Sequence, residues 1–145
     1  MKREIIFRGK REITGEWVEG YLVKRDEPFL HDIVVPVGNT SSITYAIIRG
    51  SVGQYTGLKD KNQKRIFEGD IVKFKLQDAD EYRFAKILYG EFVDENDSQF
   101  YLGFYVVGMG CTFSIFNGKD EGYDFIGICE VAGNIHDSPE LLVTE

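Results

Sequence analysis

The stretch Val52–Lys73, which reads VGQYTGLKDKNQKRIFEGDIVK, restricts the possible folds of this chain more than any other segment. Its apolar residues border two polar turns, a charged one at Lys59–Lys64 and a tight one at Glu68–Asp70. After the second turn, Val72–Leu76 alternates apolar and charged residues, which is the period of a strand with one buried face. The segment therefore predicts three short strands joined by turns.

The rest of the chain has the same character. Sixteen glycines against three prolines, together with eleven phenylalanines and eight tyrosines, favour strands and tight turns over helices. Near the C-terminus, Ser138–Leu142 reads SPELL and predicts a short helix start, since serine can cap and proline fits the first helical position. The further strands that we expect are Glu4–Arg8, Glu16–Val23, Asp32–Val37, Ser42–Ile48, Tyr82–Tyr89, Phe100–Val107, Cys111–Phe116 and one or two within Asp124–Asn134.

Closely spaced short strands with glycine-rich turns predict an all-β (mainly β) fold. The form that we expect is a small SH3-like β-barrel with additional N-terminal β-strands or hairpins and minimal helix near the C-terminus. A chain of 145 residues is long enough for one domain without disulfide staples. We therefore expect a single domain at 1–145, with an N-terminal β subregion at 1–50 and a barrel subregion at 51–145.

Charge is distributed unevenly along the chain. Residues 1–76 have a balance of +4 and residues 77–145 a balance of −11, which together give the net charge of −7. The acidic half argues against general nucleic-acid binding, because it would repel phosphates over much of the surface. Opposite charges in the two halves would suit a head-to-tail contact between copies, although strand-edge lysines and acidic loops also simply keep β-proteins soluble.

No residue pattern predicts catalysis or metal binding. His31 and His136 each precede an aspartate, but neighbours on a strand point to opposite faces, so adjacency does not predict a catalytic pair. Cys111 and Cys129 have neither metal-site nor redox spacing and predict two reduced thiols. Asp94–Asp97 lacks the central glycine of a calcium loop. We therefore expect no catalytic residue, no metal site and no cofactor.

The sequence also predicts a cytoplasmic protein without membrane contact. Charges interrupt the N-terminal residues too early for a signal peptide. The uncharged stretch Ser98–Gly118 is long enough to span a bilayer, but four glycines interrupt it. Two apolar strands joined by a turn account for it better.

One surface merits attention as an interaction site. Basic residues surround the turn at 59–65, and a further lysine lies on the following strand. Tyr55 and Phe67 flank this region, and aromatic rings beside cations can stack on bases. Three acidic residues dilute the positive charge, and a soluble turn tip with core aromatics below it explains the pattern as well. The candidate interaction residues are Tyr55, Lys59, Lys61, Lys64, Arg65 and Lys73.

Four segments together resemble a known family. They are EIIFRGKR at Glu4–Arg11, GEWVEGYLV at Gly15–Val23, QYTGLKDKNQKRIFEGDIVKF at Gln54–Phe74 and GNIHDSPELL at Gly133–Leu142. In this order they resemble the YopX family of phage and prophage proteins, over nearly the whole chain. The resemblance implies a β-rich, barrel-containing protein of bacterial viruses or integrated prophages. It implies no catalytic residue, because the family has no established biochemical activity.

The chain departs from the family pattern in its charged turn. Gln63 stands where the family usually has glycine, and Arg65 and His136 also differ from the commoner residues. Glycine at such a position commonly supplies a backbone with positive φ. We therefore expect a slightly altered turn in which Asn62 takes the positive-φ position.

These observations favour a non-enzymatic, phage- or prophage-encoded protein that binds a host or phage protein and self-associates. Small β-proteins without catalytic groups often act through strand edges and aromatic patches. The alternative is an accessory nucleic-acid-binding protein that uses the basic region Lys59–Lys75. The sequence does not name the partner.

Overall fold

The computed structural model describes residues 4–25, 31–76, 78–108, 110–117 and 125–142, which form two antiparallel sheets and three short helical segments. The predicted all-β class is confirmed. The chain divides into two compact units, Met1–Gly57 and Leu58–Glu145, and the border lies within a single strand, β5 (Gly53–Lys59).

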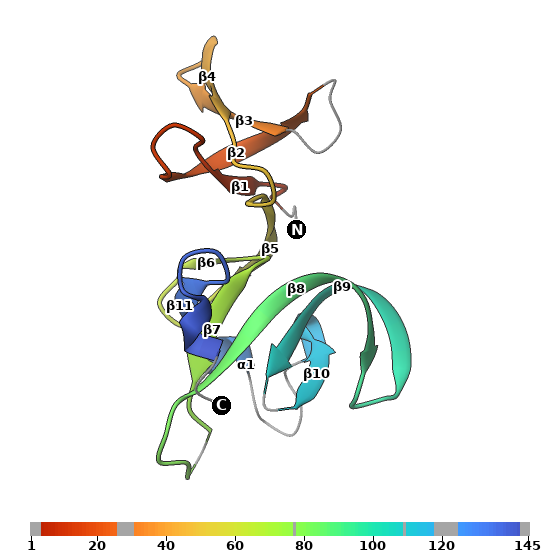
Figure 1. Ribbon diagram of the computed structural model, residues 1–145. Coiled ribbons are helices and arrows are strands. Elements are labelled where there is room, and N and C mark those ends of the chain that lie inside the picture. The colour runs from red at the N-terminus through yellow and green to blue at the C-terminus, as the bar shows by residue number, and fades with distance from the viewer. Residues whose placement is uncertain (1–3, 26–30, 77, 109, 118–124, 143–145) are drawn as a thin grey trace. The chain divides into compact units, whose positions relative to one another are not determined.

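The first unit is an antiparallel sheet in which β1 to β4 follow one another in space as they do in sequence (Figure 1). Its strands are β1 (Phe7–Lys10), β2 (Trp17–Lys24), β3 (His31–Val37) and β4 (Ser41–Ala46), and the full sheet order is β4-β3-β2-β1-β5-β6, with β6 at Arg65–Phe67. Ile33 and Ile47 are its buried aliphatic side chains. A Cβ on Gly20 would lie 2.3 Å from the carbonyl oxygen of Val34, so only glycine permits this close approach of β2 and β3.

The second unit contains the sheet β10-β9-β8-β7-β11. Its strands are β7 (Asp70–Phe74), β8 (Arg83–Asp94), β9 (Gln99–Gly108), β10 (Cys111–Ser114) and β11 (Glu130–Asn134). The prediction of a closed barrel is wrong, because β10 and β11 are opposite edges of this sheet. The physical reason is that the β8–β9 ribbon curls back on itself. The backbone N–H of Glu95, beyond the end of β8, donates to the carbonyl oxygen of Thr112 on β10.

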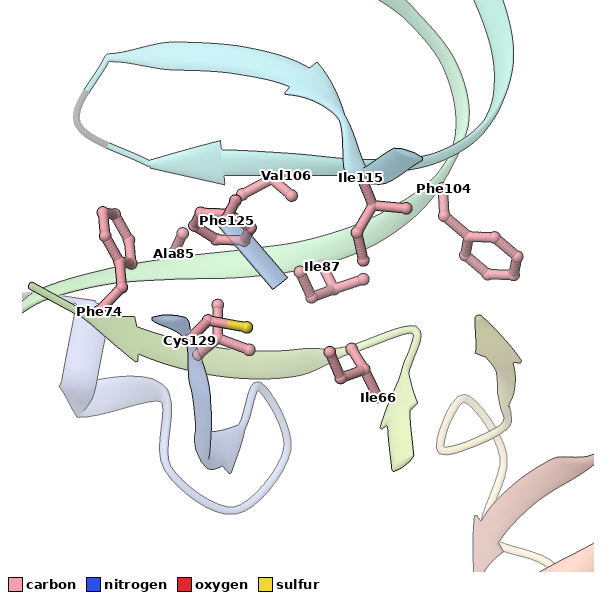
Figure 2. Packing of buried hydrophobic residues seen from close by; sticks show 10 residues of the cluster. Ile66, Phe74, Ala85, Ile87, Phe104, Val106, Ile115, Phe125 and Cys129 are labelled. Carbon is pink, nitrogen blue, oxygen red and sulfur yellow. The ribbon is translucent and has the colours of Figure 1, made fainter. Parts of the chain in front are cut away.

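The core of the second unit is a cluster of ten buried residues. Figure 2 shows side chains from β7, β8 and β9 facing Phe125 and Cys129. These two residues lie close together in the sequence, in the C-terminal part of the chain. Phe125 is 1% exposed, and its ring packs edge-on against Phe74 and Phe113, with centroids 5.0 and 5.4 Å away. The cluster consists of Ile66, Val72, Phe74, Ala85, Ile87, Phe104, Val106, Ile115, Phe125 and Cys129.

Helical segments replace parts of two expected strands, Cys111–Phe116 and the one within Asp124–Asn134. Within Asp124–Asn134, of which Asp124 lies outside the described residues, the chain forms α1 (Phe125–Ile128) before β11. The Cys129 N–H donates to the Phe125 carbonyl at 3.0 Å, and this turn directs the Phe125 ring into the core. The others are η1 (Ile115–Asn117) and, at the predicted C-terminal position, η2 (Pro139–Leu142). No helix in the described ranges has the length and apolar composition to cross a bilayer.

Truncating Phe125 tests the importance of this short helical turn. Phe125→Ala is expected to lower the free energy of unfolding by about 3–5 kcal/mol, because it leaves a cavity between two aromatic rings. Urea unfolding followed by far-UV circular dichroism measures the change. Phe116→Ala removes a half-exposed ring from the neighbouring segment η1 and is expected to change stability by less than about 0.5 kcal/mol. Equal losses in the two variants would contradict the central role of Phe125.

Candidate functional site

The charged turn at 59–65, named the basic turn here, is organised by one buried carboxylate. Asp60 is 3% exposed. Its Oδ1 accepts the backbone N–H groups of Asn62 at 2.8 Å and Lys64 at 2.9 Å, and its Oδ2 accepts the N–H of Val131 on β11 at 2.8 Å. The Asp60 N–H donates to the Lys64 carbonyl, and the Lys61 N–H donates to the Cys129 carbonyl. These bonds fix both the shape of the turn and its position against β11.

The turn contains a strained residue at the position where the sequence departs from its family pattern. Gln63 has φ of 67°, in the left-handed region. The expectation that Asn62 would take the positive φ is therefore wrong. The reason lies in the hydrogen bonds: Asp60 Oδ1 holds the Asn62 N–H, and the Asp60 carbonyl accepts from Gln63, so the reversal falls on the third residue after Asp60.

Three lysines project from this fixed turn. Lys59, Lys61 and Lys64 are exposed, and within the described part of the chain they make no ion pair. Arg65, the first residue of β6, is half-buried. The backbone thus gathers three of the predicted cations at the surface of one turn.

Lys73 is placed differently from the other predicted cations. It lies opposite Glu130 in the β7–β11 pair, and its Nζ is 3.0 Å from Glu130 Oε1. The other carboxylate oxygen of Glu130 accepts from the side-chain amide of Asn62 at 3.0 Å. The Lys73 ammonium also lies 5.1 Å from the centre of the Tyr82 ring. Lys73 therefore connects the basic turn to β11 and already has a partner.

Contact between Lys73 and Glu130 shifts the pKa of both side chains. The hydrogen bond from Lys73 is the main cause that lowers the pKa of Glu130, with desolvation opposing it, and Asn62 and Lys61 add smaller lowering effects. The same hydrogen bond and the charge of Glu130 raise the pKa of Lys73. Because the pKa of Glu130 is lowered in the folded state, the pair stabilises the fold above the pKa of unfolded Glu130. That stabilisation is lost as the pH falls through the folded-state value.

The predicted aromatic residues lie below the surface rather than on it. Tyr55 is 5% exposed and Phe67 is 2% exposed. A base could stack on either ring only if the surrounding side chains moved. The structure thus gathers the lysines of the basic turn but provides neither of these two rings as an accessible stacking platform.

The histidines and aspartates weighed for catalysis or metal binding lie apart from one another or already accept hydrogen bonds. His31 lies on β3 in the first unit and His136 follows β11 in the second. Asp32 accepts from Arg25 through both Nε and a terminal nitrogen at 2.7 Å. Asp94 is buried, and its carboxylate accepts the N–H groups of Asn96 and Ser114. Within the described ranges, no group of three histidine, cysteine or acidic residues is arranged to hold a metal ion.

Sequence reasoning missed a second candidate surface, on the ribbon formed by β8 and β9. The expected strand Tyr82–Tyr89 ends too early, because β8 continues to Asp94. Partners across an antiparallel pair share a face, and side chains alternate along each strand. From base to tip, the core-facing side of the ribbon carries Ile87, Val106, Tyr89, Phe104, Glu91, Leu102, Val93 and Phe100.

This face changes from buried to exposed along the ribbon. Ile87, Phe104 and Val106 belong to the core, whereas Leu102 is 69% exposed and Phe100 is 82% exposed. Val93 and Tyr89 are also exposed, although the Tyr89 ring contacts Phe104 edge-on. We name Tyr89, Val93, Phe100 and Leu102 the apolar strip. The signal in the sequence was the apolar pair Phe92–Val93 continuing β8 past Gly90.

The strain at Gln63 can be tested directly. Gln63→Gly is expected to raise the free energy of unfolding by about 0.5–1 kcal/mol, because glycine adopts positive φ without a Cβ clash but gains freedom in the unfolded chain. Gln63→Ala, which keeps the Cβ, is the control and should change stability by less than about 0.5 kcal/mol. Thermal unfolding of the three chains measures the order. A Gly variant less stable than the Ala variant would contradict the assignment of strain.

Substitution of Lys73 tests whether this residue lowers the pKa of Glu130. In Lys73→Met, the carboxylate loses its main hydrogen-bond donor, so the pKa of Glu130 is expected to rise toward its ordinary range. Carbon-detected NMR titration of the Glu130 carboxyl group measures this shift. Lys75→Met removes the lysine two residues along, which contacts Tyr82, and should leave the titration unchanged. An unchanged titration in Lys73→Met would contradict the cause assigned here.

Comparison with known proteins places this fold. The profile described as YopX protein matches residues 7–143. No curated protein matches the chain. Among solved structures, the chain is similar to that described as the crystal structure of protein EF1440 from Enterococcus faecalis, with 21% sequence identity and a TM-score of 0.53. The likeness covers 97% of this chain and 99% of that chain, and at this identity it shows the fold alone. With the profile matching almost its whole length, this chain belongs to the YopX protein family.

Proposed function

We propose that this chain is a non-enzymatic, phage- or prophage-encoded protein-interaction module that acts in the cytoplasm of a bacterial cell. The observation that carries the proposal is the apolar strip on the β8–β9 ribbon. Contiguous exposed apolar side chains are uncommon on soluble monomers and commonly mark surfaces that bind another protein. The four residues of the strip come from two paired strands and share one face, so they form one surface.

The energetics support a role in binding. Fully burying a leucine or phenylalanine side chain contributes about 1.5–3 kcal/mol relative to leaving it in water. Phe100 and Leu102 remain 82% and 69% exposed, so the fold of the chain alone obtains little of this stabilisation. A partner that covered both side chains would obtain most of it. Aromatic anchors of this kind dominate the energetics of many protein interfaces.

The alternative is accessory nucleic-acid binding through the region Lys59–Lys75. Its support is the gathering of three exposed lysines on a turn whose backbone Asp60 holds in place. The buried positions of Tyr55 and Phe67 weigh against it, as does the engagement of Lys73 with Glu130. Self-association is a further part of the proposal, supported by the opposite charges of the basic turn and the acidic residues 77–145.

Affinity capture from a lysate of phage-carrying bacteria tests the proposal. The tagged wild-type chain is expected to retain a defined protein that resists nuclease treatment. The double variant Phe100→Ser with Leu102→Ser should lose that protein while its circular dichroism spectrum stays unchanged, because both side chains are exposed. Ile13→Ser replaces an apolar side chain that is 89% exposed on the first unit and should retain the partner.

Two outcomes would overturn the favoured function. Retention of every partner by the double variant would remove the apolar strip as the binding surface. Captured material that disappears with nuclease, and also in a variant carrying Lys61→Glu and Lys64→Glu, would establish the nucleic-acid alternative instead.

A further inference from the structure

The apolar strip lies on the convex side of a curled ribbon. On the opposite side, the Phe92 ring stacks on Tyr101 and also on Tyr105, with centroids 5.8 and 4.7 Å away. Tyr101 is the direct partner of Phe92, whereas Tyr105 lies four residues further along β9. Phe92 reaches it past the Gly90–Gly103 pair, which has no side chains in the way. The ribbon must bend toward this side to bring the two rings together.

Hydrogen bonds at the tip confirm the direction of the bend. Asp94 shares the face of Phe92, and its carboxylate accepts the N–H of Ser114 at 2.9 Å. Ser114 is the β10 partner of Tyr105, so the tip of the ribbon returns to the strand beside its base. Figure 1 shows β8 and β9 as this arch, with β10 beneath it. The apolar strip, on the other face, therefore forms the outer surface of the arch, a ridge rather than a groove.

The charges of the ribbon beyond Lys86 have one sign. Between Lys86 and Lys119 the sequence contains no lysine, arginine or histidine, but it contains four acidic residues. Glu91 lies on the face of the strip itself, directly opposite Leu102, and is exposed. The other three lie at or beside the tip of the ribbon: Asp94, Glu95 and Asp97.

We propose that the β8–β9 ridge inserts into an apolar groove of another protein whose rim carries lysine or arginine. Phe100 and Leu102 would occupy the floor of the groove, and Glu91 would face a cation on its rim. A convex apolar surface buries most area against a concave one, and an acidic border is complemented by a basic one. The inference rests on the proposed function and adds the shape and charge of the partner.

Other occupants fit the ridge poorly. A second copy that met it through the same face would oppose two convex surfaces and bring Glu91 and the acidic tips together, which is unfavourable for like charges. Nucleic acid and anionic lipid surfaces would be repelled by the exposed carboxylates of Glu91, Glu95 and Asp97. Each of these occupants is a distinct outcome of the experiment below.

Site-specific photocrosslinking in phage-carrying cells tests the inference. The full chain carries p-benzoylphenylalanine in place of Phe100, and mass spectrometry identifies what is attached to it. The same substitution at Tyr82, a half-exposed ring beside Lys73, reports on another surface of the same unit. Each probe is also combined with Glu91→Lys. The control combines each probe with Glu81→Lys, which makes an equal change in net charge at another exposed glutamate.

The expected result is a protein attached at position 100 but not at position 82. Glu91→Lys should lower the yield about tenfold, because reversal replaces attraction to the basic rim by repulsion, whereas Glu81→Lys should leave it unchanged. High salt should lower the wild-type yield and narrow the difference from Glu91→Lys.

The failures can be told apart. Equal yields in Glu91→Lys and Glu81→Lys would overturn the basic rim, while capture that still depends on Phe100 and Leu102 would leave the proposed function standing. Attachment to a second copy of the chain, to nucleic acid or to lipid would overturn the inference in favour of that occupant. No attachment at position 100, together with capture that is indifferent to Phe100 and Leu102, would overturn both.

Discussion

The Asp60 carboxylate is the contact on which the second unit depends most. It accepts three backbone N–H groups, two within its own turn and one on β11, which is 71 residues further along the chain. A buried carboxylate is unfavourable unless its oxygens are hydrogen-bonded, so the charge is compatible with its burial only when turn and strand are both in place. Asp60 therefore couples a local structure to a long-range one. The exposed lysines of the basic turn are held in position by the same hydrogen bonds.

Buried aspartates organise two further turns in the unit, and they explain what the sequence could and could not predict. Asp70 accepts the Phe67 N–H within a tight turn, and Asp94 bonds its own turn and β10. Turns at Asp60 and Asp70 were predictable, because aspartate within two residues of asparagine or glycine is local turn chemistry. The bonds from Asp60 to Val131 and from Asp94 to Ser114 were not, since no local pattern specifies a partner so far along the chain. The Asp94–Ser114 bond holds the tip of the β8–β9 ribbon against β10, and the prediction of a closed barrel did not anticipate this curl.

The candidate site was predictable to a similar extent. The charged turn correctly placed Lys59, Lys61 and Lys64 at the surface, because charge near a turn is a local property. It did not reveal that Lys73 is half-buried against Glu130 across the β7–β11 pair. The burial of Tyr55 and Phe67 depends on which elements cover them, and composition does not reveal that. The apolar strip was not predicted from the sequence for a different reason. Glycine and acidic residues after Tyr89 are typical of a loop, whereas here they continue a strand whose Gly90 sits at φ of 151°.

The exposed strip is not needed to hold the ribbon in shape. Stacking of Phe92 on two tyrosines acts on the opposite face, and the bonds of Asp94 and Glu95 to β10 fix the tip. Phe100 and Leu102 contribute little to either, yet exposed apolar side chains on a ribbon favour aggregation. The acidic residues beside them oppose that aggregation by mutual repulsion between copies. A ribbon that repels the same ribbon of a second copy while presenting two large apolar side chains is consistent with one use. Those side chains would stabilise an assembly only when a different, oppositely charged surface covers them.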